Sequence, residues 1–292
     1  QTLAHITSAS LDGLSKEFKK FPPSMVLVQG DTSTSFSGAL AAFYSKIPVA
    51  HVEAGLRTNS LYDPFPEEAN RRFISQIAAL NFAPTDLAES NLKREGVFGK
   101  IFNTGNTVID SLLSVEKYCQ RPNIEGLDLT AKKLVLVTIH RRENWGENIK
   151  NIANAIKKLS KDFKDLIFLL PMHKNLIVRK KLKSNLKNCS NVFLSEPLDY
   201  LNLVSVMKSS YIVLTDSGGI QEEAPTFGKP VFILRDTTER PEGVNAGISF
   251  LIGTKTKDIV REVSKIIENK QLYESIAKAT NPYGDGNSSL KI

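Results

Sequence analysis

Acidic residues in the first third of the sequence follow segments that have the composition of buried strands. Asp31 comes just after the apolar segment 25–29, Glu53 comes just after the segment 48–52, and Glu67 begins the next helical pattern. In a parallel sheet the carboxyl ends of the strands meet at one edge, which is where such folds bind their ligands. Asp31 alone could be a helix cap. Three carboxylates at one edge favour general acid–base chemistry.

A second group of polar residues occupies the same kind of position later in the chain. His140 and Arg141 follow a predicted strand at 134–138, and His173 follows another at 166–170. A titratable ring beside fixed guanidinium charge suits the binding or departure of a pyrophosphate. The alternative is a basic turn that faces solvent.

The turn formed by Ser217, Gly218 and Gly219 joins a predicted strand to a predicted helix. Glycine leaves backbone N–H groups bare at a helix start, where they can bind phosphate. The alternative is a tight turn that needs glycine only for its geometry. We expect Glu222 and Glu223 in the first turn of this helix. There they either complement the helix dipole, or one of them accepts hydrogen bonds from a ribose.

The elements that must position these residues alternate regularly along the chain. Strands are predicted at 25–29, 48–52, 80–83, 100–103, 134–138, 166–170, 192–194, 212–214 and 231–234, and helices at 36–45, 66–78, 86–94, 108–119, 148–163, 176–186, 200–208, 219–227 and 257–269. Apolar strands that alternate with amphipathic helices imply parallel sheets covered on both faces. We therefore expect an α/β protein with two doubly wound, Rossmann-like domains that face each other across a cleft.

A polar stretch interrupts this alternation and divides the chain. We predict an N-terminal Rossmann-like domain at 1–122, a linker at 123–131, a C-terminal Rossmann-like domain at 132–275, and a terminal segment at 276–292 that returns towards the first domain. A length of 292 residues, 41% of them hydrophobic, is sufficient for two domains of this kind.

The charge and composition narrow the classes of partner. The formal net charge of +7 permits nucleic acid, but the sequence lacks a recognition module or interleaved basic and aromatic residues, and a small anionic substrate explains the charge equally well. No apolar run approaches the ~20 residues that a membrane span needs. Three acids could hold a metal ion, but no spaced His–acid cluster or DxD pair supports one. We expect no metal and no cofactor.

Cysteine usage bears on the compartment. The chain has 2 cysteines, Cys119 and Cys189, and neither belongs to a CxxC pair. We interpret them as reduced thiols, which favours a cytoplasmic protein. The start of the chain also lacks the pattern of a signal peptide.

Several stretches of the sequence resemble those of one enzyme family, the non-hydrolysing UDP-N-acetylglucosamine 2-epimerases. They are GDTSTSFSGALAAFYSKIPVAHVEAGLRT, PFPEEANRR, NTGNTVIDSL, TIHRRENWGENI, LSEPLDYLNLV and TDSGGIQEEAPTFGKPVFILRDTTERPEGVNAG. The resemblance implies the two-domain GT-B fold, with the active site in the interdomain cleft. The family's first strand and its Gly-Thr-Arg-Pro-Glu loop have no counterpart here, so the resemblance also predicts a chain that is incomplete at its start.

The resemblance implies roles for individual residues. The four that match catalytic residues of the family are Asp31, Glu53, Glu67 and His140. Those that match its UDP contacts are Ser217, Gly218, Gly219, Glu223 and Arg240. Arg141 and His173 match positions near a second UDP-N-acetylglucosamine, which activates bacterial members, or near the pyrophosphate.

The implied reaction is the reversible inversion of C2 between UDP-N-acetylglucosamine and UDP-N-acetylmannosamine. A base removes the C2 proton while UDP leaves C1, and UDP then adds back to a bound 2-acetamidoglucal. The family also implies a homodimer. Two alternatives stay open: a hydrolysing epimerase or an epimerase of a diacetamido sugar nucleotide, and a truncated UDP-binding protein without turnover.

Overall fold

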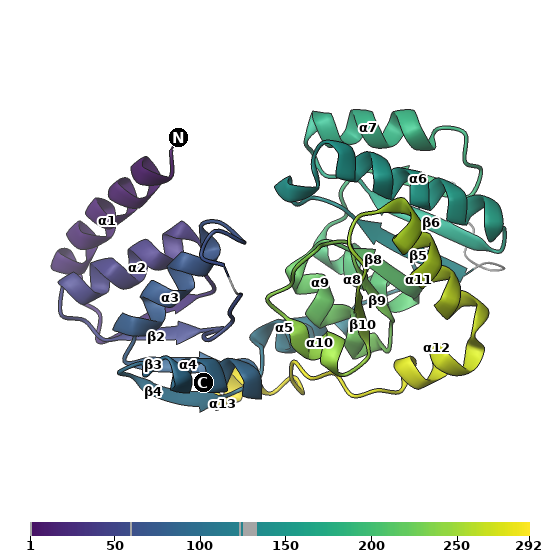
Figure 1. Cartoon of the computed structure of the whole chain (residues 1–292). Coiled ribbons are helices and arrows are strands. Elements are labelled where there is room, and N and C mark those ends of the chain that lie inside the picture. The colour runs from purple at the N-terminus through teal and green to yellow at the C-terminus, as the bar shows by residue number, and fades with distance from the viewer. Residues whose placement is uncertain (1, 59, 123, 125–132) are drawn as a thin grey trace. The chain divides into compact units, whose positions relative to one another are not determined.

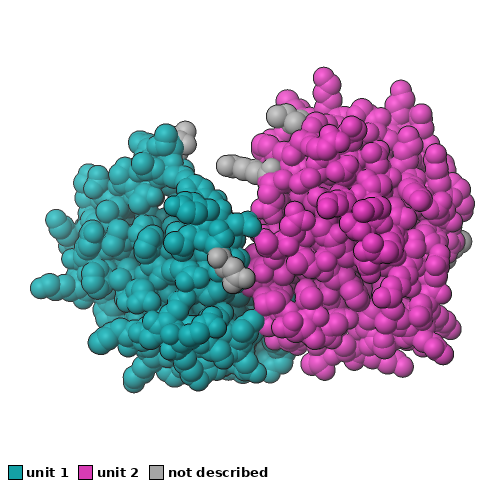
Figure 2. All heavy atoms as spheres, viewed as in Figure 1, with its two compact units in different colours: residues 1–110, 283–292 teal, residues 111–282 magenta. Residues whose placement is uncertain are grey.

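The computed structural model describes residues 2–58, 60–122, 124 and 133–292. The chain forms two compact units, shown in separate colours in Figure 2. Unit 1 comprises Gln1–Asp110 and Tyr283–Ile292, and unit 2 comprises Ser111–Pro282. Apart from Ile124, the predicted linker at 123–131 lies outside the described residues.

Unit 1 is built on a parallel sheet of four strands in the order β1-β2-β3-β4 (Figure 1). Its strands are β1 (Val26–Gln29), β2 (Val49–Val52), β3 (Leu80–Ala83) and β4 (Lys100–Asn103). Its helices are α1 (Leu3–Lys20), α2 (Ser33–Tyr44), α3 (Glu67–Ile77), α4 (Asp86–Arg94) and α13 (Ser288–Lys291), and α5 (Thr107–Glu116) spans the division between the units.

Helices cover both faces of this sheet because its strands carry apolar side chains on both. Val28 and Val49 pack with Ile74 of α3 and with alanines of α2. Ala83 packs with Ala88 and other buried residues around α4. This arrangement places the carboxyl ends of all four strands at one edge of the sheet.

Unit 2 is built on a parallel sheet of six strands in the order β10-β9-β8-β5-β6-β7. The strands are β5 (Lys133–Thr138), β6 (Leu166–Pro171), β7 (Val192–Ser195), β8 (Ser210–Thr215), β9 (Val231–Ile233) and β10 (Ser249–Leu251). The helices are α6 (Glu147–Asp162), α7 (Leu176–Leu186), α8 (Tyr200–Ser209), α9 (Gly218–Glu223), α10 (Pro241–Asn245), α11 (Thr256–Glu268) and α12 (Lys270–Ala277), with 3₁₀ turns η1 (Arg142–Asn144) and η2 (Ala224–Phe227).

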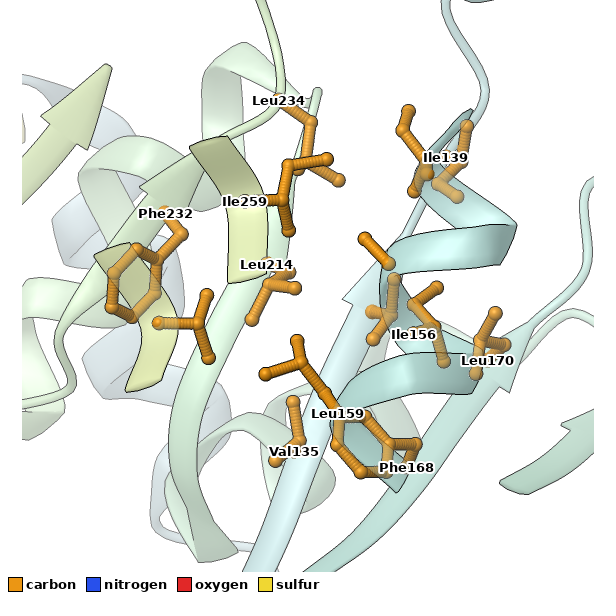
Figure 3. Packing of buried hydrophobic residues seen from close by; sticks show 14 of the residues in the cluster. Val135, Ile139, Ile156, Leu159, Phe168, Leu170, Leu214, Phe232, Leu234 and Ile259 are labelled. Carbon is orange, nitrogen blue, oxygen red and sulfur yellow. The ribbon is translucent and has the colours of Figure 1, made fainter. Parts of the chain in front are cut away.

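One hydrophobic cluster of unit 2 lies between its sheet and helices α6 and α11, and a second packs the other face of the sheet against α8 and α9. Figure 3 shows Val135, Phe168 and Leu214 of the sheet packed with Ile156 of α6 and Ile259 of α11. Ile156, Ile259 and the three strand residues are fully buried. Dense packing of this kind fixes the strand ends, and with them the loops that follow.

The α/β class and the two parallel sheets predicted from the sequence are confirmed. Each predicted strand and helix is present, and the helices predicted at 86–94 and 176–186 have the predicted bounds. Several elements were not predicted, including α1, α10, α12, α13 and β10. Helix α1 has no fully buried residue, although its Phe18 packs against the core cluster of α2 and α3. Cys119 and Cys189 are free thiols, as predicted.

A histidine occupies the centre of the unit 1 sheet. His51 in β2 is completely buried, and its Nε2 donates to the Gly30 carbonyl at 2.9 Å. It pairs in register with Asn81 of β3, which is also completely buried. Within the described part of the chain, neither His51 Nδ1 nor the Asn81 amide has a hydrogen-bond partner. Burial lowers the pKa of His51 to about 4.

The low pKa of His51 predicts that acid destabilises the folded protein. Between pH 6.5 and pH 4 the unfolded chain binds a proton at His51 that the folded chain does not, so stability falls as the pH falls. The difference in the pKa of His51 between the unfolded and folded states lowers the free energy of unfolding by about 3 kcal/mol when the pH falls from 7 to 4. Urea unfolding at pH 7 and pH 4 should therefore show a smaller pH dependence for His51→Gln, which cannot titrate.

The exposed His5 offers a matched control, and His5→Gln should follow the parent protein. An equal pH dependence of stability in the parent and in His51→Gln would contradict the buried, neutral state of His51.

Candidate active site

Two of the three predicted carboxylates belong to residues at the carboxyl edge of the unit 1 sheet. Strands β1 and β2 are paired as far as Gln29 and Val52, and Gly30 N donates to the Val52 carbonyl at 3.1 Å. Asp31 and Glu53 follow directly. Glu53 Oε2 lies 3.8 Å from the position that a Cβ on Gly30 would occupy, which places the Glu53 carboxylate beside the loop that carries Asp31.

The backbone at Glu53 is unusual. Its φ of 65° lies in the left-handed region, which side chains other than those of Gly, Asn and Asp rarely adopt. Strained residues of this kind concentrate at functional sites, where the surrounding structure holds them in place. The conformation turns the chain at the strand end and directs it into the loop that leads to α3.

The third carboxylate, Glu67, begins helix α3, and this helix contacts Asp31 directly. Asn70 Nδ2 donates to the Asp31 carbonyl at 2.8 Å, and Arg71 Nη2 donates to Asp31 Oδ2 at 2.6 Å. The helix therefore connects Glu67 to the loop of Asp31. Two glutamates, Glu67 and Glu68, occupy its first turn.

In unit 2, His140 is oriented by a buried carboxylate that the sequence did not identify. His140 Nδ1 lies 2.9 Å from Asp216 Oδ1, and Asp216 is completely buried at the end of β8. Asp216 also accepts hydrogen bonds from the His140 and Arg141 backbone N–H groups and from Asn144 Nδ2. Burial alone would raise the pKa of Asp216, but the His140 ring and these donors hold it below the usual value.

The Asp216 contact determines which nitrogen of His140 is available. The Asp216 carboxylate can only accept hydrogen bonds. Nδ1 is the ring nitrogen that faces it, so Nδ1 must carry a proton. Nε2 is then the ring nitrogen left for a ligand. The His173 ring lies with its centroid 6.4 Å from that of His140.

A pocket of about 440 Å³ opens at the carboxyl ends of β5, β6 and β8, all within unit 2. Its polar lining residues include His140, His173 and Ser217, and its apolar ones include Leu198 and Leu203. A mostly apolar cavity with a few polar groups at one end is typical of a small-molecule site.

The glycine turn differs from the sequence prediction in one respect. Helix α9 begins at Gly218, so Glu222 and Glu223 lie in its last turn. Their predicted place in the first turn is therefore wrong, because the helix ends at Glu223 and continues only as the 3₁₀ turn η2. The acids thus do not complement the positive end of the helix dipole, and another explanation for them is needed.

Gly218 has a packing reason as well as a possible ligand role. A Cβ at Gly218 would lie 2.7 Å from Arg240 Nη1, so a larger residue there would displace the Arg240 side chain from its present position. Ser217 N donates to Thr215 Oγ1 at 2.9 Å. The N–H groups of Gly218 and Gly219 are therefore the ones in this turn that can bind a ligand, because the first N–H groups of a helix have no partner within it.

Arg240 is buried in a network of ion pairs. It pairs with Glu222 and Glu239, and Glu239 also pairs with Arg235 at 2.9 Å. Burial alone would raise the pKa of Glu239, but Arg240 and Arg235 hold it at about 2. Two carboxylates thus compensate the charge of Arg240. The network fixes the charged loop against α9.

Glu223 contacts Tyr200, which the sequence did not identify as a site residue. The Tyr200 hydroxyl donates to Glu223 Oε1 at 2.5 Å. Burial raises the pKa of Glu223, although the Tyr200 hydrogen bond opposes this. Burial and the nearby Glu223 also raise the pKa of Tyr200. The pair forms a polar group that can read hydroxyls of a ligand.

Residues missed by the sequence interpretation share one property: their partners are distant in the chain. Asp216 lies 76 positions from His140, and Arg71 lies 40 positions from Asp31. The only sequence signal was the position of Asp216 at a strand end.

Arg141 is partly buried, and its Nη2 lies 3.8 Å from Glu239 Oε1.

Two further features concern the described residues as a whole. No group of three or more His, Cys, Asp or Glu side chains among them could hold a metal ion. None of their helices combines the length and the apolar character that a membrane crossing demands.

The fold and these residues define a class: a two-unit, parallel α/β protein with a small-molecule pocket at the carboxyl edge of a sheet. The family model described as UDP-N-acetylglucosamine 2-epimerase matches residues 1–292. The UDP-N-acetylglucosamine 2-epimerase of Neisseria meningitidis serogroup A is 48% identical over 300 residues, covering 100% of this chain and 81% of the relative. A putative one from Thermotoga maritima is 46% identical, covering 100% and 78%.

Solved structures agree with the sequence comparison. The Neisseria meningitidis UDP-GlcNAc 2-epimerase bound to UDP-GlcNAc superposes with a TM-score of 0.96 at 46% identity, covering 100% of this chain and 81% of that one. The UDP complex of S. aureus MnaA gives 0.92 at 44% identity, with 100% and 80% covered. The chain belongs to the UDP-N-acetylglucosamine 2-epimerase family, a family of isomerases. The GT-B-like fold class and the resemblance seen in the sequence are confirmed.

The Asp216–His140 contact predicts the tautomer of the histidine. We expect ¹⁵N NMR to find the proton of neutral His140 on Nδ1. Asp216→Asn should shift the population towards the Nε2–H form, because an asparagine amide can donate to Nδ1. His173 in the same spectra serves as the reference ring. A tautomer of His140 that is unchanged in Asp216→Asn would contradict this assignment.

Proposed function

We propose that this protein interconverts UDP-N-acetylglucosamine and UDP-N-acetylmannosamine by inverting C2 of the sugar. The buried Asp216 that orients His140 beside the pocket carries the proposal, because it prepares one ring nitrogen for a ligand there. Membership of the family supports the substrate, since a relative with a TM-score of 0.96 was solved bound to UDP-GlcNAc.

Unit 2 binds the UDP portion. The apolar pocket lining, including Leu198 and Leu203, suits the flat uracil ring. The bare N–H groups of Gly218 and Gly219 suit a phosphate. Glu223 can accept hydrogen bonds from the ribose hydroxyls, in exchange for or beside the one from Tyr200.

His140 assists the departure of UDP. When the C1–O bond breaks, its electron pair goes to the pyrophosphate, whose negative charge increases. Asp216 contacts Nδ1 of His140, so Nε2 remains available for a ligand. When the ring carries protons on both nitrogens, Nε2–H can donate a hydrogen bond to the departing pyrophosphate, and the Asp216 carboxylate at Nδ1 stabilises that imidazolium.

Unit 1 supplies the carboxylates Asp31, Glu53 and Glu67. The C2–H bond is not acidic, so loss of UDP runs ahead of proton removal and leaves positive charge at C1. A carboxylate stabilises that charge, and another removes the C2 proton. The electron pair of the C2–H bond forms the C1–C2 double bond of 2-acetamidoglucal. Protonation of C2 on the opposite face and return of UDP to C1 complete the inversion, and no cofactor takes part.

Three further points belong to the same proposal. A second UDP-N-acetylglucosamine activates the enzyme through Arg141 and His173, and His173 is a lining residue of the pocket. The protein acts as a homodimer, and it acts in the cytoplasm.

A product assay tests the proposal. Incubation with UDP-N-acetylglucosamine should give a mixture of the two sugar nucleotides, which anion-exchange chromatography separates. Free N-acetylmannosamine with a matching release of UDP would instead indicate a hydrolysing epimerase. Tight binding of UDP with no change in the sugar would indicate a binding protein without turnover.

The division of roles predicts that the carboxylates matter for turnover and little for binding. Asp31→Asn, Glu53→Gln and Glu67→Gln should each lower turnover by at least ~10²-fold, because each removes a charge or a proton acceptor. Isothermal titration should find UDP dissociation constants changed less than ~5-fold, because UDP binds to unit 2. Glu89→Gln, in an exposed pair with Lys93 on α4, is the matched control. Parental turnover in the triple variant would exclude a catalytic role for these acids.

Glu223 should contribute to UDP affinity. Glu223→Ala should weaken UDP binding by about 1.5–3 kcal/mol, the range for hydrogen bonds to a charged group. Tyr200→Phe should have a smaller effect, since it leaves the carboxylate in place. Glu262→Ala on α11, away from the pocket lining, is the control. Parental affinity in Glu223→Ala would remove Glu223 from the nucleotide site.

A further inference from the structure

Asp31 stands at the end of a chain of alternating charges within unit 1. Three arginines and three carboxylates are joined by five contacts: Arg57–Glu95 at 2.6 Å, Glu95–Arg72 at 3.0 Å, Arg72–Glu68 at 2.8 Å, Glu68–Arg71 at 3.1 Å and Arg71–Asp31 at 2.6 Å. We call this set the charge chain. Its arginines and carboxylates are equal in number, so their formal charges cancel.

The two members of the charge chain nearest to Asp31 are buried, whereas Asp31 itself is partly exposed. The side chain of Glu68 is 0% exposed and that of Arg71 is 3% exposed. Asp31 is 24% exposed. A buried ion remains stable only when its partners are well placed, so Glu68 constrains where the Arg71 guanidinium can lie. Arg71 thereby sets the position of a carboxylate that a substrate can reach.

Hydrogen bonds to backbone atoms hold the loop that carries Asp31, and a separate contact holds its carboxylate. His51 holds the Gly30 carbonyl, and Asn70 holds the Asp31 carbonyl. Among the residues that the structure describes, the carboxylate itself is contacted by Arg71, through Oδ2. The first two contacts fix the backbone, whereas Arg71 fixes the direction of the side chain and the oxygen that it offers.

The Arg71 guanidinium uses its two Nη atoms for carboxylates and leaves a third nitrogen without a hydrogen bond to any described residue. Within the described residues its buried Nε has no hydrogen-bond partner. Arg71 lies on α3, the helix that begins at Glu67. Helix α3 therefore carries one candidate acid, Glu67, as its first residue, and it positions a second one, Asp31, through Arg71.

We propose that Arg71 is a positioning residue for Asp31, which holds its carboxylate in the orientation that the reaction requires. The inference rests on the function proposed above for Asp31. Orientation of a reacting group is worth a large factor in rate, and a misplacement of about 1 Å can cost about 10²-fold. A residue that acts only in this way affects turnover and leaves substrate affinity in place.

A double-mutant cycle tests this proposal. Arg71→Met should lower kcat by about 10²-fold, with the KM for UDP-N-acetylglucosamine and the UDP dissociation constant changed less than about 3-fold. Arg71→Lys, which restores a cation, should recover at least about 10-fold of the loss. In an Asp31→Asn background, Arg71→Met should have almost no further effect, because residues that act as a unit are not additive.

Arg72 provides the matched control for stability. It lies next to Arg71, makes two ion pairs of the same charge chain, and does not contact Asp31. Arg72→Met and Arg71→Met should both lower the melting temperature, and only Arg71→Met should lower kcat beyond about 3-fold. A matching loss of kcat in Arg72→Met would overturn the positioning role.

The remaining outcomes separate this inference from the proposed function. Full activity of Asp31→Asn would defeat the catalytic role of Asp31 itself. An inactive Asp31→Asn together with a fully active Arg71→Met would overturn the role of Arg71 alone. So would losses of kcat that multiply in the double variant. If Arg71→Met does not fold, Arg71→Lys carries the cycle: its loss of kcat must disappear in the Asp31→Asn background, and a loss that persists there overturns the proposal.

Discussion

A charged side chain that is removed from water must find a partner, and this constraint organises both units of the protein. Glu68 in unit 1 and Asp216 in unit 2 are completely buried. Glu68 forms ion pairs with arginines, whereas Asp216 accepts hydrogen bonds from a histidine ring nitrogen, an asparagine amide and backbone N–H groups. In unit 1, Arg71 pairs with the buried Glu68 and also contacts the candidate catalytic residue Asp31. In unit 2, the partner of the buried Asp216 is itself a candidate catalytic residue, His140.

The parallel sheets explain why these groups lie where they do. Each sheet ends its strands at a single edge, so residues from separate strands become neighbours without a long loop. Gly30 and Glu53 at the edge of unit 1, and His140 and Ser217 at the edge of unit 2, illustrate this. The apolar cores fix the strands, and the buried polar groups fix the side chains. In the function proposed above, unit 2 binds the nucleotide and unit 1 supplies the acids.

The sequence predicted the sheets and most helices because their apolar periodicity is local. The helix at 86–94, for example, follows the capping residue Thr85 and was predicted with its observed bounds. The sequence could not predict that Glu222 lies in the last turn of α9 and pairs with Arg240. Nor could it assign Asp216 to His140 or Arg71 to Asp31. Such pairings depend on register and packing between distant segments, for which a single sequence carries no periodic signal.

The central claim is that the C2 proton is removed and returned from solvent while UDP leaves and comes back. The most direct test is ¹H NMR and mass analysis of UDP-N-acetylglucosamine incubated with the protein in heavy water. The account predicts that UDP-N-acetylmannosamine forms with one deuterium at C2, and that the recovered UDP-N-acetylglucosamine acquires the same label. Epimerisation that retains the original proton at C2 would contradict the elimination mechanism and the role given to the carboxylates of unit 1.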